Sequence, residues 1–161
     1  MEKDQTEKDQ MEKEDLLENN IPESNFEIKI PYRNSGFPKE ATKTKLFHSD
    51  KIEVRKSTLQ GYGVFAKENI DNGEILEECH YVEVEYGKEV DRFKFNWPKG
   101  EDFKKYVLSL GYGSIYNTAI PVDKKNTDWK TDLDNDILIF YTIKDVKKDS
   151  ELLVDYDYQS Y

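Results

Sequence analysis

The chain has 161 residues, and its 34 acidic and 24 basic side chains give a formal net charge of −10. This length suits one domain of ordinary size, and an aromatic content of 13% is too high for a chain that is disordered throughout. The negative charge argues against nucleic-acid binding through a general basic surface and favours a basic partner, which an acidic surface attracts.

The few cysteine and histidine residues exclude several other classes of protein. Cys79 is the single cysteine, so the chain cannot form an internal disulfide or a thiolate-rich zinc site. His48 and His80 are the only histidines, which argues against a histidine-based zinc site. The longest uncharged apolar stretch, residues 137–143, is far shorter than a membrane span, and no secretory signal precedes the domain. We therefore expect an intracellular protein of the cytoplasm or nucleus, without direct nucleic-acid or membrane contact.

The first 50 residues differ in composition from the rest. Residues 1–20 form an imperfect five-residue repeat with eight acids and three lysines, which predicts an acidic disordered tail. A docking tail for a basic partner is the alternative interpretation. Residues 21–50 are predicted to be a linker or N-terminal extension, because prolines and a glycine interrupt them. Within that linker, residues 26–30 alternate like a strand.

A dense pattern of short strands begins at residue 51. Residues 52–55 alternate between apolar and polar side chains, and residues 60–63 form a glycine-rich turn before a strand at 64–66. Residues 70–74 have strong turn chemistry, since Asn and Gly tolerate positive φ. Residues 81–86 alternate again and predict a half-buried strand.

One segment has helical spacing. In residues 101–110, the apolar side chains Phe103, Tyr106, Val107 and Leu110 stand at i, i+3, i+4 and i+7. This spacing places them on one face of an α-helix. The sequence therefore predicts a helix at 101–110.

The last third of the chain returns to strands. Residues 129–132 and 137–143 predict a hairpin around a Leu-Asp-Asn-Asp bend, and residues 151–156 predict one more short strand. We expect a mostly β (β-rich α+β) fold of several short strands in small sheets, with little helix.

Two local motifs have ordinary interpretations. Residues 132–136 begin like a calcium loop, but Ile137 and Ile143 stand where an EF-hand needs Gly and Glu. A hairpin turn is therefore predicted there, and no metal site. The Gly-x-Gly pairs at 61–63 and 111–113 do not extend to a dinucleotide-binding motif, so each alone indicates a tight turn.

The order of four segments carries more information than any one of them. They are QGYGVFA at 60–66, IDNGEI at 70–75, GSIYNTA at 113–119, and IFYTIKDVKKDSELLVDY at 139–156. With this order the chain resembles a SET domain, the fold of protein-lysine methyltransferases that use S-adenosylmethionine, over residues 51–161. The span from Gly63 to Asn117 is short, so the chain resembles the minimal stand-alone SET domains of viruses and bacteria, and we expect no Cys-rich post-SET module.

The resemblance implies roles for individual residues. Gly61, Tyr62 and Gly63 match the motif whose backbone receives the methionine end of the cofactor, where glycine allows the main chain to approach a ligand closely. Asn117 and Thr118 match positions that hold the cofactor. Tyr156 matches the tyrosine at the methyl-transfer site and is the predicted catalytic residue. The aromatic residues expected to line the substrate channel are Tyr116, Trp129 and Tyr158.

The resemblance also implies a substrate and leaves one alternative open. The expected partner is a basic, lysine-containing protein or peptide of histone-like character, methylated without a metal. Thr118 and Ala119 stand where the family has His and Ser. The alternative is therefore a SET-fold module that is catalytically weak or inactive and binds a basic peptide. The oligomeric state stays open.

Overall fold

The computed structural model describes residues 43–85, 87, 88, 90–100 and 102–156. The predicted acidic tail, the strand-like segment at 26–30 and Tyr158 lie outside these residues. No helix within the described ranges is long and apolar enough to cross a membrane. The elements in chain order are β1 (Ile52–Lys56), β2 (Tyr62–Ala66), β3 (Ile75–Cys79), β4 (Tyr81–Val84), β5 (Lys94–Trp97), β6 (Lys105–Ser109), β7 (Asn117–Thr118), the 3-10 turn η1 (Val122–Lys124), β8 (Thr127–Asp132), β9 (Ile137–Thr142) and β10 (Glu151–Val154).

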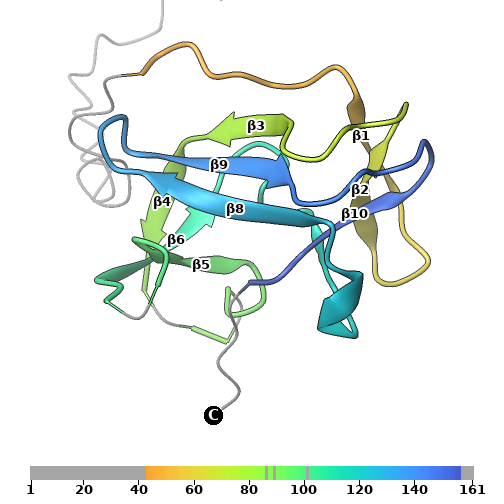
Figure 1. Ribbon diagram of the computed structural model, residues 1–161. Helices are drawn as coiled ribbons and strands as arrows, with labels where there is room; N and C mark the ends of the chain where they lie inside the picture. Colours follow the sequence, from red (N-terminus) through yellow and green to blue (C-terminus); the bar gives the residue numbers. More distant parts are fainter. Residues whose placement is uncertain (1–42, 86, 89, 101, 157–161) are drawn as a thin grey trace, which may run out of the picture. The chain divides into compact units, whose positions relative to one another are not determined.

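The strands form three small sheets, with the orders β1-β2-β10-β7, β3-β9-β8 and β4-β6-β5. Figure 1 shows the β1-β2-β10 strands and the β4-β6-β5 sheet toward opposite ends of the β3-β9-β8 sheet. The prediction of a mostly β fold made of short strands is confirmed. The two-residue strand β7 pairs in parallel with β10, so β10 holds Asn117 and Thr118 in place.

The predicted hairpin is confirmed. Strands β8 and β9 pair antiparallel from Thr127 opposite Thr142 to Asp132 opposite Ile137. Oδ1 of Asp132 accepts hydrogen bonds from the backbone N–H groups of Asp134 and Asn135, both at 3.1 Å. The first aspartate of the calcium-like sequence therefore caps a turn, as the hairpin interpretation requires.

The predicted helix at 101–110 is wrong. Residues 105–109 form β6, the central strand of its sheet, which pairs with β4 on one side and β5 on the other. Val107 is fully buried, while Leu110, which the helical pattern placed on the same face, is 39% exposed. Backbone pairing on both sides and the strand preference of Tyr and Val outweigh the apolar spacing.

The last residues of the predicted linker lie along β3. The backbone N–H of Ser49 donates to the Leu76 carbonyl at 2.8 Å, and Lys43 pairs with Glu78 at 2.7 Å. His48 forms an isolated β-bridge with Glu77. Residues 43–50 are thus attached to the edge of the β3-β9-β8 sheet.

A partly buried carboxylate, Asp128, predicts acid sensitivity. Burial tends to raise the pKa of Asp128, but hydrogen bonds from Lys99 (2.6 Å) and the Trp129 N–H (2.8 Å), with the Lys125 ammonium, hold it below its ordinary value. Its stabilisation is therefore present above the unfolded pKa of about 4 and is lost as the pH falls through the lower folded value. We expect Asp128→Asn to lose on the order of 1–2 kcal/mol at neutral pH. Urea unfolding should show this loss shrinking at about pH 3, and a pH-independent difference would contradict it.

Candidate active site

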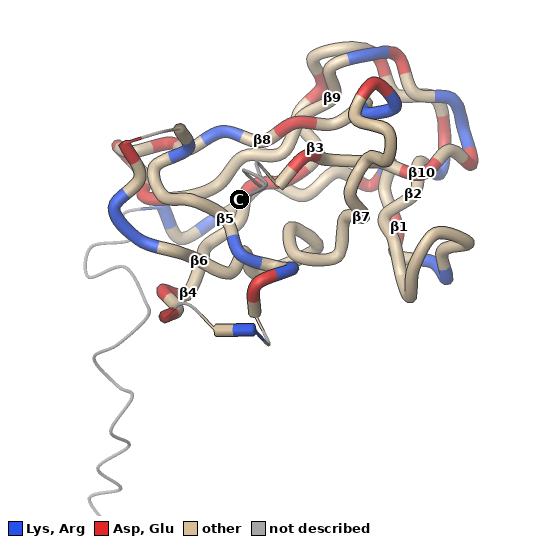
Figure 2. Tube along the Cα trace, turned by 90° about the horizontal axis from the view of Figure 1, so that it is seen from below, with Lys and Arg blue, Asp and Glu red and all other residues tan. Residues whose placement is uncertain are grey.

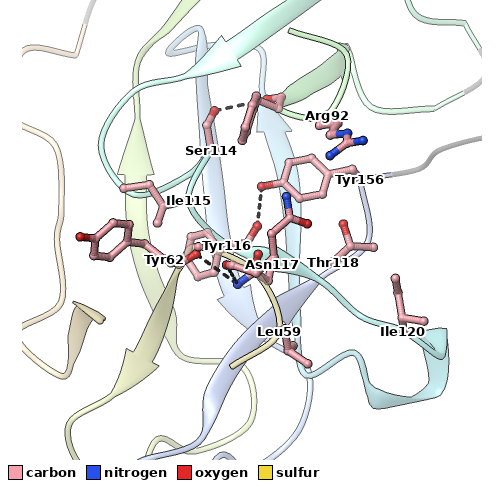
Figure 3. Close-up of a pocket in the computed structure, with 13 residues that line it drawn as sticks. Leu59, Tyr62, Arg92, Ser114, Ile115, Tyr116, Asn117, Thr118, Ile120 and Tyr156 are labelled. Atoms are coloured by element: carbon pink, nitrogen blue, oxygen red, sulfur yellow. Dashed lines mark hydrogen bonds between the residues drawn. The ribbon is translucent and has the colours of Figure 1, made fainter. Parts of the chain in front are cut away.

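A pocket of about 640 Å³ opens beside the β1–β2 turn, β7 and the end of β10. Sites for small molecules have volumes of roughly 300–1,000 Å³, so it is large enough for a cofactor. Its wall comes from four separate stretches of the sequence (Figure 3). The lining residues are Leu59, Gln60, Gly61, Tyr62, Arg92, Phe93, Ser114, Ile115, Tyr116, Asn117, Thr118, Ile120 and Tyr156.

Gly61 and Gly63, the two glycines of the first predicted cofactor motif, are required for different structural reasons. Gly61 has a φ of +52°, and no atom lies within 4 Å of the place where a Cβ would project. Its backbone therefore borders open space in the pocket wall, as close approach by a ligand requires. Gly63 is buried, and a Cβ there would lie 2.0 Å from Oε1 of Glu151. Gly63 is thus a glycine because it makes room for a carboxylate of its own chain.

Asn117 connects the pocket wall to this carboxylate. Its Nδ2 donates to the carbonyl oxygens of Tyr62 and Gln60 at 3.1 and 3.2 Å (Figure 3). It also donates to Oε1 of Glu151 at 2.6 Å. Glu151 also accepts a hydrogen bond from the Ser57 hydroxyl at 2.9 Å. One amide group therefore fixes the β1–β2 turn against β7 and β10.

Tyr156 stands at the inner wall of the pocket with 4% of its surface exposed. Its hydroxyl donates to the Tyr116 carbonyl at 2.7 Å, and its ring packs on Phe95 with centroids 4.7 Å apart. Figure 3 shows this hydroxyl pointing toward the Tyr116 carbonyl. The ring packing and the hydrogen bond together orient the Tyr156 hydroxyl.

Comparison with known proteins identifies the family. A family model for the SET domain matches residues 61–157. The chain belongs to the SET domain family. This finding confirms the prediction from the sequence, including its activity class, that of protein-lysine methyltransferases.

Two relatives of this SET domain carry more specific descriptions. A histone-lysine N-methyltransferase of Schizosaccharomyces pombe, described as specific for lysine 37 of histone H3, is 30% identical over 113 residues. The match spans 65% of this chain and 72% of that protein. A solved Plasmodium falciparum structure, described as a candidate histone methyltransferase, has a TM-score of 0.55 and 30% identity and covers 69% of this chain and 96% of that one.

The positions at which this SET domain departs from the family motif keep their backbone contacts. Thr118 lines the pocket and pairs with Val154 in the parallel β7–β10 ladder. Ala119 is buried at 5% exposure, and its N–H donates to the Val154 carbonyl at 2.8 Å. The Thr and Ala side chains therefore leave the backbone of this wall paired with β10.

The predicted substrate-channel residues separate in the structure. Tyr116 lines the pocket, and its ring stacks on Phe140 with centroids 5.0 Å apart. Trp129 is fully buried in the core, where it packs edge-on against Phe95, and it does not line the pocket. Trp129 is therefore a core residue in this structure, and its channel role stays a prediction that the Trp129→Ala variant tests. Tyr158 lies outside the described residues.

Sequence reasoning missed several residues of the pocket. Leu59 and Ile120 are 58% and 78% exposed, so large apolar side chains that no motif indicated border the opening. Arg92 is the charged residue among those that line it, and Figure 3 shows it on the Ser114 side, away from Leu59 and Ile120. Arg92 comes from the irregular segment between β4 and β5, which has no motif that could have indicated its position.

Proposed function

We propose that this SET domain binds S-adenosylmethionine in the pocket and methylates a lysine side chain of a basic, histone-like protein or peptide. The observation that carries the proposal is the convergence of three distant motifs on one pocket. Gly61 and Tyr62, then Asn117 and Thr118, and finally Tyr156 all line it.

The pocket residues fit the chemical groups of this cofactor. The open space beside the Gly61 backbone admits a ligand against the main chain, and exposed apolar side chains suit a flat aromatic ring. Arg92 supplies a positive charge that can pair with a carboxylate. The bound cofactor supplies an electrophilic methyl group. The residues proposed to hold it are Gly61, Tyr62, Asn117 and Thr118, with Gly63 allowing the Glu151–Asn117 contact beneath them.

Tyr156 is proposed as the catalytic residue because of what the reaction requires. The lysine amine reacts only when it is deprotonated, and its lone pair must point along the line of the sulfur–methyl bond that breaks. A hydroxyl that donates to the Tyr116 carbonyl is held in direction and can accept a hydrogen bond from an amine N–H. Its contribution is therefore orientation, with the walls of Tyr116 and Tyr156 limiting the access of water.

The proposed substrate rests on the relatives and on charge. The relatives are described as acting on histones, and the net charge of −10 favours a basic partner. Figure 2 shows acidic and basic residues interspersed along the described chain, so no single acidic face stands out in that view. We propose that the residues of the pocket, and not a single acidic face, recognise the basic substrate. We also propose that the protein works in the cytoplasm or nucleus, where such substrates occur.

Two measurements test the proposed function. Calorimetry should show binding of S-adenosylmethionine, and mass spectrometry of purified histones incubated with the protein and labelled cofactor should show labelled lysine. Histones with their lysines chemically blocked are the control and should stay unlabelled. Cofactor binding without transfer would favour the binding module left open by Thr118 and Ala119, and absence of both would refute the proposal.

We expect Asn117→Ala to weaken cofactor binding. The change removes the amide that fixes the Tyr62 and Gln60 carbonyls at the pocket wall. The expected loss is about 1–3 kcal/mol, roughly ten- to a hundredfold in Kd measured by calorimetry. Asn135→Ala, which removes an amide from the distant β8–β9 turn, is the control and should bind as the parent does. Unchanged affinity in folded Asn117→Ala would place the cofactor elsewhere.

A further inference from the structure

The side chain of Glu77 on β3 is a buried carboxyl group outside the pocket lining. Glu77 is 1% exposed, and its Oε2 accepts the Tyr112 N–H at 3.2 Å and lies 3.5 Å from Nδ1 of His48. Its other oxygen, Oε1, has no hydrogen-bond partner among the described residues. Burial raises the pKa of Glu77, against the opposing effect of the Tyr112 N–H and its neighbours. A buried oxygen without a partner is costly, so this arrangement requires an explanation.

The hydroxyl of Tyr116 can explain the unpaired oxygen of Glu77. It too is buried and without a hydrogen-bond partner in the part of the chain that the structure describes. Burial raises the pKa of Tyr116, and the charge of Glu77 raises it further, while the Tyr116 hydroxyl lowers that of Glu77. Glu77 stands opposite Phe140 in the β3–β9 pairing, and the Tyr116 ring stacks on Phe140, so the two unpaired groups lie beside the same core residue. A small adjustment that joins them satisfies both at once.

Tyr116 also connects Glu77 to the proposed catalytic residue. Its ring is held against Phe140, nearly parallel at an interplanar angle of 11°. Its backbone carbonyl accepts the Tyr156 hydroxyl at 2.7 Å. Whatever fixes the hydroxyl end of Tyr116 therefore also limits movement of the carbonyl that orients Tyr156.

We propose that Glu77 is a positioning residue, whose carboxyl accepts a hydrogen bond from the Tyr116 hydroxyl and so fixes the carbonyl that orients Tyr156. This inference rests on the proposed function, because the contact is proposed to place the Tyr156 hydroxyl correctly for methyl transfer. Glu77 itself touches neither cofactor nor substrate, since it does not line the pocket. Its effect is therefore expected in kcat and not in cofactor affinity.

The first test compares two replacements of Glu77. Glu77→Met keeps the approximate length but removes both acceptors, so kcat should fall at least about tenfold while the Kd for S-adenosylmethionine stays within about twofold. Glu77→Gln keeps an acceptor for the Tyr112 N–H and offers an N–H to the Tyr116 oxygen, so it should restore most of kcat. Glu78→Gln, on the next residue of β3, is the matched control because its carboxylate pairs with Lys43 instead. Equal kcat in folded Glu77→Met and the parent would overturn the proposal.

The second test joins the two groups in a double-mutant cycle. In a Tyr116→Phe background the pair is already broken, so Glu77→Met should lower kcat much less than it does in the parent. Should Glu77→Met fail to fold, Tyr116→Phe alone must show the tenfold loss, and a parental kcat there would overturn the proposal.

A stability cycle tests the pair even if the protein transfers no methyl group. The urea midpoints of Glu77→Met, Tyr116→Phe and the double variant should be non-additive, because each single change removes the same contact. Additive midpoint shifts would show that the two groups do not interact. A non-additive cycle in a protein that transfers no methyl group would refute the proposed function but keep the Glu77–Tyr116 contact. An additive cycle would refute the contact itself.

Discussion

Tyr156→Phe should lower the methyl-transfer rate by about tenfold or more, which corresponds to a barrier increase above about 1.4 kcal/mol. The change keeps the ring on Phe95 but deletes the hydroxyl that donates to the Tyr116 carbonyl. Cofactor affinity should change little, because the remaining pocket wall is intact. Single-turnover kinetics with a substrate that the parent methylates, together with calorimetry, measure the two quantities separately.

Tyr81→Phe is the matched control for this experiment. Tyr81 is also a fully buried tyrosine, and its hydroxyl donates to Asp136 at 2.6 Å at a distance from the pocket. It should lose stability of about 1 kcal/mol, as Tyr156→Phe does, but keep the parental rate. Full turnover by Tyr156→Phe would remove Tyr156 from the catalytic role.

Trp129→Ala should destabilise the fold by about 3–5 kcal/mol, the usual cost of emptying the space of a large core side chain. Trp129 is fully buried, packs on Phe95, and donates from Nε1 to the Asp155 carbonyl at 3.2 Å. Chemical unfolding measures the loss. A channel-lining role would instead lower turnover in a protein of nearly parental stability.

Leu133→Ala is the control for Trp129→Ala. Leu133 lies in the neighbouring β8–β9 turn and is 65% exposed, so its truncation should change stability by less than about 0.5 kcal/mol. A Trp129→Ala variant as stable as Leu133→Ala would contradict the core position of the indole.

The predicted helix shows where local pattern is insufficient. Residues 103–110 have apolar side chains at helical spacing, and the same residues also suit a strand. The choice depends on β4 and β5, whose backbone groups pair with both edges of β6. Those partners lie about 10 to 30 residues away, beyond the reach of a periodicity argument. The β8–β9 hairpin was predictable because its two strands and its turn residues are adjacent in the sequence.

The amino-acid sequence by itself determined the family, the β-rich class and six of the thirteen residues that line the pocket. It could do so because motifs such as the Gly61 turn and the closing strand require particular residue types in a particular order, which can be read from the sequence. Only the tertiary structure decided that Trp129 belongs to the core, that Gly63 makes room for Glu151, and that Arg92 reaches the pocket. It also brought Glu77 and Tyr116, which are 39 residues apart, to the same core residue, Phe140. These facts depend on side-chain packing between distant segments, which no local spacing in the chain records.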